Sequence, residues 1–193
     1  MSLSPKILAF AGSTRRESYN KKLVQIAAHG AKEAGAEVTI VDLKDYPLPL
    51  FDEDLEAASG LPETALKLKK LFLDHHGLLI SSPEYNSSLT AVLKNTLDWV
   101  SRPAPGESSL AAFHGKVASI ISASPGALGG LRGFVHLRAI LGNIGVIVLP
   151  EQVAVPKAYE AFAGDGSLKD AKQQASVQNV GKKLAETICK LVS

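Results

Sequence analysis

The sequence predicts an α/β fold in which a doubly wound, five-stranded parallel sheet carries helices on both faces. Five short apolar segments of strand length alternate along the chain with stretches in which apolar residues recur at helical spacing. Parallel neighbours need a crossover connection, which is usually a helix. The 193 residues are 46% hydrophobic and contain no internal repeat or flexible linker, so we expect a single domain over residues 1–193.

The predicted strands are apolar or β-branched runs bounded by glycine or polar residues. They cover residues 6–11, 37–43, 78–81 and 116–122, with a fifth strand that begins at residues 146–149. Amphipathic stripes predict helices near residues 23–31, 62–73, 89–100, 131–141 and 168–192. Each predicted strand is therefore followed by a stretch long enough to cross back over the sheet.

Residues 45–62 interrupt this alternation with three prolines and an acidic cluster around Asp52, Glu53, Asp54 and Glu56. Prolines disfavour regular structure and carboxylates favour water, so we expect a solvated loop here.

Composition and charge exclude several classes of protein. A net charge of +2 is too small for a surface that binds nucleic acid through its phosphates. The single cysteine, Cys189, cannot form an internal disulfide, and the first residues resemble neither a signal peptide nor a membrane span. The sequence contains no Cys-x-x-Cys pair and no His-Glu-x-x-His helix, so it does not predict a metal site. We therefore expect a cytoplasmic protein without nucleic-acid partners, membrane insertion or bound metal.

Polar residues gather in the loops after the first, third and fourth predicted strands, where a doubly wound sheet binds its ligands. Residues 12–20 combine hydroxyls, an amide and two guanidinium groups just before a helix, which suits a phosphate. This loop has neither the glycine-rich turn of dinucleotide sites nor a P-loop, so we expect a monophosphate held mainly by side chains. The alternative is that Ser18 or Asn20 only caps the helix and Arg15 is only a solvated charge.

The other two loops suit a flat ligand. The segment 83–86 can present backbone groups along the edge of a planar heterocycle, with Tyr85 against its face, although a proline-initiated turn is the simpler alternative. After the fourth strand, Gly126, Gly129 and Gly130 allow close approach of the backbone to a ligand, unless the last two only begin a helix. Together the three loops predict a site for a planar ring with a phosphate tail.

The motifs GSTRRESYN, LPLFDED, SPEYNSS with LKNTLDW, and SPGALGG with LR resemble the flavodoxin-like NAD(P)H-dependent FMN reductase family, which includes quinone, azo-dye and chromate reductases. The resemblance spans about residues 6–155 and implies a flavodoxin-like fold, bound FMN, and NADPH or NADH as co-substrate. The FMN-binding residues that it implies form three groups: Ser13, Arg15, Ser18 and Asn20 at the phosphate; Pro83, Glu84, Tyr85 and Asn86 along the ring; and Ser124 and Gly126 completing the pocket. Thr14 and Ser87 depart from the residues common in the family, so the edge of the pocket, and with it substrate preference, is expected to differ.

FMN would accept hydride from the nicotinamide and pass the electrons to a quinone, free flavin, azo compound or metal oxyanion by a ping-pong mechanism. Backbone N–H groups of residues 83–86 would stabilise the reduced ring, and no side chain is expected to be catalytic. The alternatives are a flavin-dependent electron carrier or a flavin-sensing module on the same fold. A serine hydrolase is disfavoured because the sequence after the first strand does not supply G-x-S-x-G.

The resemblance also implies a homodimer or homotetramer that assembles through the helix containing residues 94–99, from Lys94 to Trp99. In the helical stripe Trp99 falls away from the positions that face the core, which predicts an exposed aromatic at an interface. The alternative is a partly buried core residue.

Overall fold

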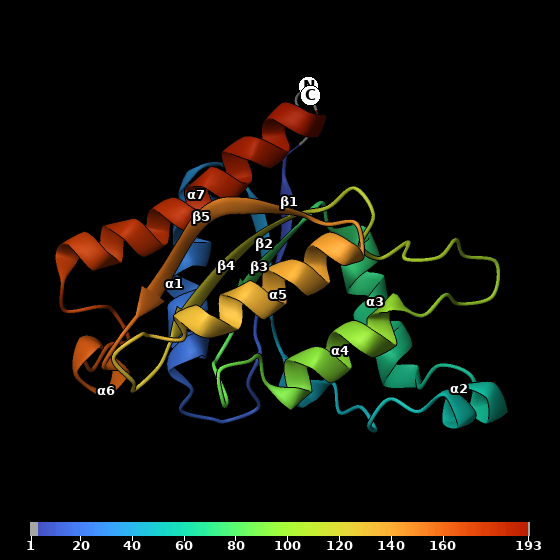
Figure 1. Ribbon diagram of the computed structural model, residues 1–193. Helices are drawn as coiled ribbons and strands as arrows, with labels where there is room; N and C mark the ends of the chain where they lie inside the picture. The colour runs from blue at the N-terminus through green and yellow to red at the C-terminus, as the bar shows by residue number, and fades with distance from the viewer. Residues whose placement is uncertain (1–3, 193) are drawn as a thin grey trace.

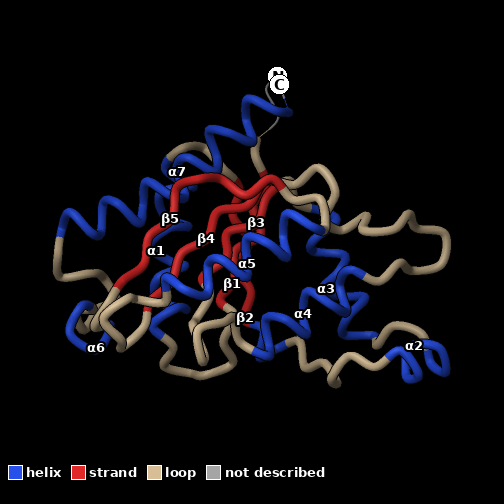
Figure 2. The backbone as a smooth tube through the Cα atoms, in the orientation of Figure 1, coloured by secondary structure: helices blue, strands red, loops and turns tan. Residues whose placement is uncertain are grey.

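The computed structural model describes residues 4–192, and its centre is a five-stranded, all-parallel sheet with strand order β2-β1-β3-β4-β5 (Figures 1 and 2). The strands are β1 (Lys6–Ala11), β2 (Glu37–Asp42), β3 (Gly77–Ser81), β4 (Val117–Ala123) and β5 (Ile147–Val155). The chain winds outward from β1 to β2, returns to β3 on the other side, and continues to β5. The predicted doubly wound α/β fold is confirmed, and its winding direction reverses between β1 and β3.

Helices cover both faces of the sheet: α1 and α7 lie on one face, and α3, α4 and α5 on the other (Figure 1). The helices are α1 (Tyr19–Glu33), α2 (Glu53–Ser59), α3 (Glu63–Asp74), α4 (Ala91–Ser101), α5 (Leu131–Asn143), α6 (Ala158–Ala161) and α7 (Ala171–Val192), with a short 3-10 turn, η1, at Leu43–Asp45. Among residues 4–192, no helix has both the length and the apolar character that crossing a membrane requires.

Alternation within the strands fills both faces at once. In β1, Ile7 and Ala9 pack into the core under α1 and α7, while Leu8 and Phe10 pack into the core under the opposite helices. All four residues are fully buried. A central parallel strand therefore needs apolar residues at every position, which explains why its sequence is a continuous apolar run.

Helices α1 and α7 cross at two glycines. A Cβ atom at Gly30 would lie 2.0 Å from the carbonyl oxygen of Gln178, and one at Gly181 would lie 1.8 Å from that of Ala27. Both contacts are with backbone atoms, which cannot move aside without moving a helix. The two glycines thus set how closely α7 packs on α1.

We expect Gly181→Ala to destabilise the protein by about 3 kcal/mol through overpacking at this crossing. Gly142→Ala is the matched control, because Gly142 is a helical glycine in α5 whose added Cβ would meet nothing within 4 Å. The control should stabilise by up to about 1 kcal/mol through helix propensity. Urea denaturation without added cofactor measures both, and equal midpoints for the two variants would contradict the crossing argument.

The acidic segment is partly helical, so the prediction of a loop over its whole length is wrong. Residues Glu53–Ser59 form α2, which begins where the Asp52 side chain accepts a hydrogen bond from the Asp54 N–H at 2.8 Å. No residue of α2 is buried, so the expected contact with water is present. Local capping and first-turn carboxylates, rather than packing, favour this helix.

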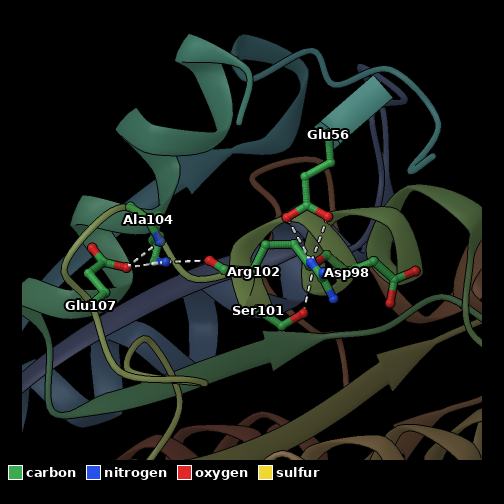
Figure 3. A network of polar contacts seen from close by, with 7 residues as sticks. Glu56, Asp98, Ser101, Arg102, Ala104 and Glu107 are labelled. Carbon is green, nitrogen blue, oxygen red and sulfur yellow. Dashed lines mark hydrogen bonds and ion pairs between the residues drawn. The ribbon is translucent and has the colours of Figure 1, made fainter. Parts of the chain in front are cut away.

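A polar network anchors α2 and the loop after α4 (Figure 3). Arg102 Nε lies 2.8 Å from Glu56 Oε2, and the Arg102 guanidinium also lies over the ring of Phe51. The buried Lys69 of α3 pairs with Glu107 and donates a hydrogen bond to the Arg102 carbonyl. The buried ammonium of Lys69 is thus paired with a partly exposed carboxylate and a carbonyl oxygen, which satisfies the usual condition for a charge inside a protein.

Trp99 is fully buried within the chain, so its predicted exposure at an interface is wrong. Its Nε1 donates a hydrogen bond to the Pro49 carbonyl at 2.8 Å, and its ring meets Phe51 edge-on at 5.0 Å. Both partners come from the segment between β2 and α2, which folds over this side of α4. Helical spacing alone could not reveal this cover, because it comes from residues some 50 positions earlier in the chain.

Lys116 precedes β4 and is 7% exposed, with its Nζ donating to the His75 carbonyl. Burial lowers the pKa of its ammonium to about 8 from the ordinary value of 10.5. Between these two pH values the unfolded chain binds more protons than the folded one at this position. The contribution of Lys116 to stability therefore rises with pH from about 8 to 10.5.

We expect the unfolding free energy of Lys116→Met to rise less steeply, or fall more steeply, between pH 8 and 10 than that of the wild type. Lys172→Met removes the same charge from an exposed position and is the matched control. Denaturation midpoints across this pH range measure the slopes. If the slopes of the two variants agree, Lys116 is not the source of the pH dependence.

Candidate functional site

Three loops at the carboxyl edge of β1, β3 and β4 enclose an open pocket of about 230 Å³. The pocket is lined by Ser13, Arg15, Ser18, Tyr19, Asn20, Pro83, Glu84, Tyr85, Ala123, Ser124 and Pro125. The three polar loops recognised in the sequence therefore meet at one site, which lies where the winding of the sheet reverses. A pocket below the usual range of roughly 300–1,000 Å³ encloses part of a nucleotide-sized ligand and leaves the rest accessible.

Most residues implied by the family resemblance line this pocket. Asn86 and Gly126 are the two that do not, although each lies close in sequence to a residue that does. The Gly126 N–H donates to Ser124 Oγ at 3.2 Å, so this glycine shapes the loop that carries Ser124. Which of these residues contact FMN stays a prediction.

The loop between β1 and α1 brings anion-binding groups to one end of the pocket. Ser18 is the N-cap residue of α1 but makes no side-chain capping bond, and the hydroxyl of Ser13 accepts a hydrogen bond from the Arg15 N–H at 3.3 Å. The first turn of α1 adds backbone N–H groups and the positive end of the helix dipole. Hydroxyls, N–H donors and a guanidinium together form a donor set that fits a phosphate.

Arg15 is held at this end by an aromatic stack that the sequence analysis missed. Its guanidinium carbon lies 5.3 Å from the ring centroid of Tyr19. Tyr19 in turn stacks on Phe162, with ring centroids 5.6 Å apart and an interplanar angle of 18°. The adjacent Tyr19 was visible beside the predicted phosphate residues, but Phe162 lies 143 positions away, and no local pattern links it to them.

Asn20 connects the three segments that carry the site. Its Nδ2 donates to the Ala123 carbonyl at 2.8 Å, and its Oδ1 accepts from the Ala123 N–H at 3.0 Å and from Ser81 Oγ at 2.8 Å. Asn20 is 4% exposed, so these bonds lie in a region shielded from water. The side-chain amide thus fixes the start of α1 against the ends of β3 and β4.

Two further side chains connect the site loops to helices. Glu84 Oε2 accepts hydrogen bonds from the Arg132 and Gly133 N–H groups at 2.9 and 3.2 Å. Glu84 therefore caps α5, whose own N-cap residue, Gly130, has no side chain to do so. Thr90, which the sequence analysis missed, caps α4 through the Leu93 N–H and donates to the Gly12 carbonyl at 2.7 Å. The segment between β3 and α4 is thus joined through Glu84 to α5 and through Thr90 to the loop after β1.

Residues 5–160 match the family model for NADPH-dependent FMN reductases. An NAD(P)H-dependent FMN reductase of Pseudomonas aeruginosa is 36% identical over 179 residues, which is 92% of each protein. An NAD(P)H:quinone oxidoreductase of Solanum tuberosum is 33% identical over 184 residues, covering 91% of this chain and 88% of that protein.

Solved structures agree with these sequence relatives. The flavoenzyme FerB, an NAD(P)H:(acceptor) oxidoreductase from Paracoccus denitrificans, superposes with a TM-score of 0.81 at 28% identity, over 96% of this chain and 98% of FerB. The resemblance drawn from the loop motifs is therefore confirmed. The chain belongs to the NADPH-dependent FMN reductase family and is a flavodoxin-like oxidoreductase that uses FMN with NAD(P)H.

Proposed function

We propose that this protein takes hydride from NAD(P)H through bound FMN and passes the electrons to a quinone by a ping-pong mechanism. The observation that carries the proposal is the single pocket in which the three polar loops meet. The name of the potato relative makes a quinone the first acceptor to test. Free flavins, azo compounds and metal oxyanions remain further candidate acceptors.

FMN, when bound, supplies a planar ring that accepts and releases hydride equivalents, so the protein needs no nucleophile of its own. In this proposal Ser13, Ser18 and the first turn of α1 bind the phosphate, with Arg15 supplying a positive charge. The segment from Pro83 to Asn86 borders the ring. No residue is assigned a catalytic role.

Backbone N–H groups of this segment were predicted to face the ring edge and stabilise its reduced form. The Tyr85 N–H is not free for that role, because it donates to the Ser88 carbonyl at 2.9 Å. The Glu84 carboxylate is likewise engaged, as the cap of α5. In this proposal the loop therefore shapes the ring-binding part of the pocket and offers the ring only the main-chain groups of its other residues.

The open side of the pocket is where the nicotinamide and the acceptor would bind in turn. A single accessible face suits alternate occupation, because two planar substrates cannot stack on the same surface at once. A shared binding face of this kind is what supports the ping-pong order in this proposal. A flavin-dependent electron carrier or a flavin-sensing module would bind FMN without oxidising NAD(P)H.

Mixing the protein with FMN and NADPH without oxygen should bleach the flavin absorbance rapidly, and a quinone should restore it. In steady-state assays, double-reciprocal plots at several quinone concentrations should give parallel lines. Intersecting lines would exclude the ping-pong order. If neither NADPH nor NADH bleaches the flavin, the protein does not oxidise either nucleotide, which would favour the carrier or the sensing module.

We expect Arg15→Met to weaken FMN binding by about 10- to 100-fold, because a hydrogen bond to a charged group contributes roughly 1.5–3 kcal/mol. Riboflavin lacks the phosphate, so its affinity should change little. Arg16→Met, at the exposed neighbouring position outside the pocket lining, is the matched control. Fluorescence titration measures both ligands. An equal loss for riboflavin would show that Arg15 does not act through the phosphate.

We also propose a homodimer or homotetramer with α4 at the interface. Its support is no longer Trp99 but the neighbouring Leu50, which is 78% exposed. Leu50 is presented rigidly, because the Asn95 side chain donates to the Pro49 carbonyl and accepts from the Phe51 N–H, each at 2.8 Å. Leu50 stands between Pro49 and Phe51, which both contact Trp99 of α4, so an exposed apolar side chain lies beside the helix that the resemblance assigns to the interface.

Leu50→Asp should lower the mass of the particle in solution, because a carboxylate in an apolar contact is unfavourable. Light scattering after size exclusion measures the mass. Asp54→Asn is the control: it changes the charge of the exposed helix α2 by one unit and leaves Leu50 in place. A monomeric wild-type protein would remove the proposal altogether.

A further inference from the structure

The turn that carries Tyr85 has a backbone that its own sequence does not favour. Tyr85 and Ser88 exchange backbone hydrogen bonds of 2.9 and 3.1 Å, which makes a two-residue hairpin. The central residues, Asn86 and Ser87, have φ angles of 50° and 67°. Two positive φ angles are the pattern of a type I′ turn, in which Asn-Gly is preferred.

Asn86 suits this turn, because asparagine enters the left-handed region more readily than most residues. Ser87 does not, because its Cβ atom meets the backbone in that conformation. The hairpin therefore carries strain at Ser87, and such strain persists only where surrounding contacts hold the conformation.

Helix α5 supplies those contacts. Arg132 Nη1 donates to Ser87 Oγ at 3.1 Å and lies 3.8 Å from Glu84 Oε1. One turn further along the helix, His136 Nδ1 lies 2.9 Å from Ser88 Oγ. The strained residue and the residue after it are therefore both held by side chains from one face of α5.

We propose that Arg132 is a positioning residue of the flavin site, because its bond to Ser87 keeps the hairpin left-handed and so fixes where Tyr85 stands in the pocket. Tyr85 lines the pocket and is 60% exposed, so its position depends on the backbone of the hairpin and not on packing in the core. This inference rests on the proposed function, since it concerns the loop assigned to the ring.

A different role for Arg132 makes a different prediction. Its side chain is 59% exposed beside the pocket, so it is also placed to contact an anionic substrate directly. A direct contact would be lost on substitution whatever residue stands at position 87. A positioning role depends on the strain at Ser87, and glycine at that position removes the strain.

The test uses four variants: Arg132→Met, Ser87→Ala, Ser87→Gly, and the double variant Arg132→Met with Ser87→Gly. Arg132→Met and Ser87→Ala each lose the hydrogen bond between Arg132 and Ser87, here called the clamp, but keep a Cβ atom at position 87. Ser87→Gly also loses the hydroxyl but needs no clamp. Ser87→Ala and Ser87→Gly differ by one methyl group and are matched controls for each other.

The first readout is amide hydrogen exchange of Tyr85 and Ser88 in protein without FMN, measured by NMR. Exchange should accelerate in Arg132→Met and Ser87→Ala and return to near the wild-type rate in the double variant. Thermal midpoints should stay close to that of the wild type, because the hairpin lies at the surface. Unchanged exchange in Arg132→Met would overturn the inference.

The second readout is the FMN dissociation constant. We expect about a tenfold rise in Arg132→Met, a comparable rise in Ser87→Ala, and recovery in the double variant. A rise that glycine does not reverse would assign Arg132 to direct binding and overturn the positioning role. Wild-type protein that bound no FMN would instead overturn the proposed function, while the exchange data would still test the clamp.

Discussion

The side-chain amide of Asn20 is the contact on which the arrangement of the site depends. It stands in the first turn of α1 and bonds to both backbone groups of Ala123 and to the hydroxyl of Ser81. Each of these partners lies at the end of a different strand. A buried amide with three hydrogen bonds fixes geometry better than apolar contact, because its donors and acceptors have fixed directions. The start of α1 and the ends of β3 and β4, which border the pocket, are thereby held at a set separation.

The other contacts around the pocket are of the same kind, because side chains of one segment form hydrogen bonds with backbone N–H or C=O groups of another. Glu84 caps α5 from a neighbouring loop, and Thr90 caps α4 while its hydroxyl donates to the Gly12 carbonyl, just after β1. Helix ends leave N–H groups without partners, so they attract such contacts. Two of these side chains, Asn20 and Glu84, also line the pocket, so the same residues border the site and hold its loops in place.

How much of this was predictable depended on whether the signal was local. The alternation of apolar runs identified the sheet and its helices, and the polar loops after three of the strands identified the segments that line the pocket. Trp99 was misplaced because its cover comes from Pro49 and Phe51, in a segment read as a solvated loop. The left-handed backbone at Ser87 was equally hidden, because serine gives no sign of a positive φ and the supporting arginine lies 45 positions away.

The aromatic stack on Tyr19 has a bearing on where this protein can be divided. The match to the family model ends at residue 160, and Phe162 comes just after it. Tyr19 stacks on Phe162, and the Arg15 guanidinium lies over the Tyr19 ring. Helix α7, whose Gly181 lets it press on α1, lies wholly beyond that boundary. A fragment that ended at residue 160 would keep every loop of the pocket. It would lose Phe162 and α7, which pack against α1. The part of the chain that the family model matches is therefore shorter than the part that supports the pocket.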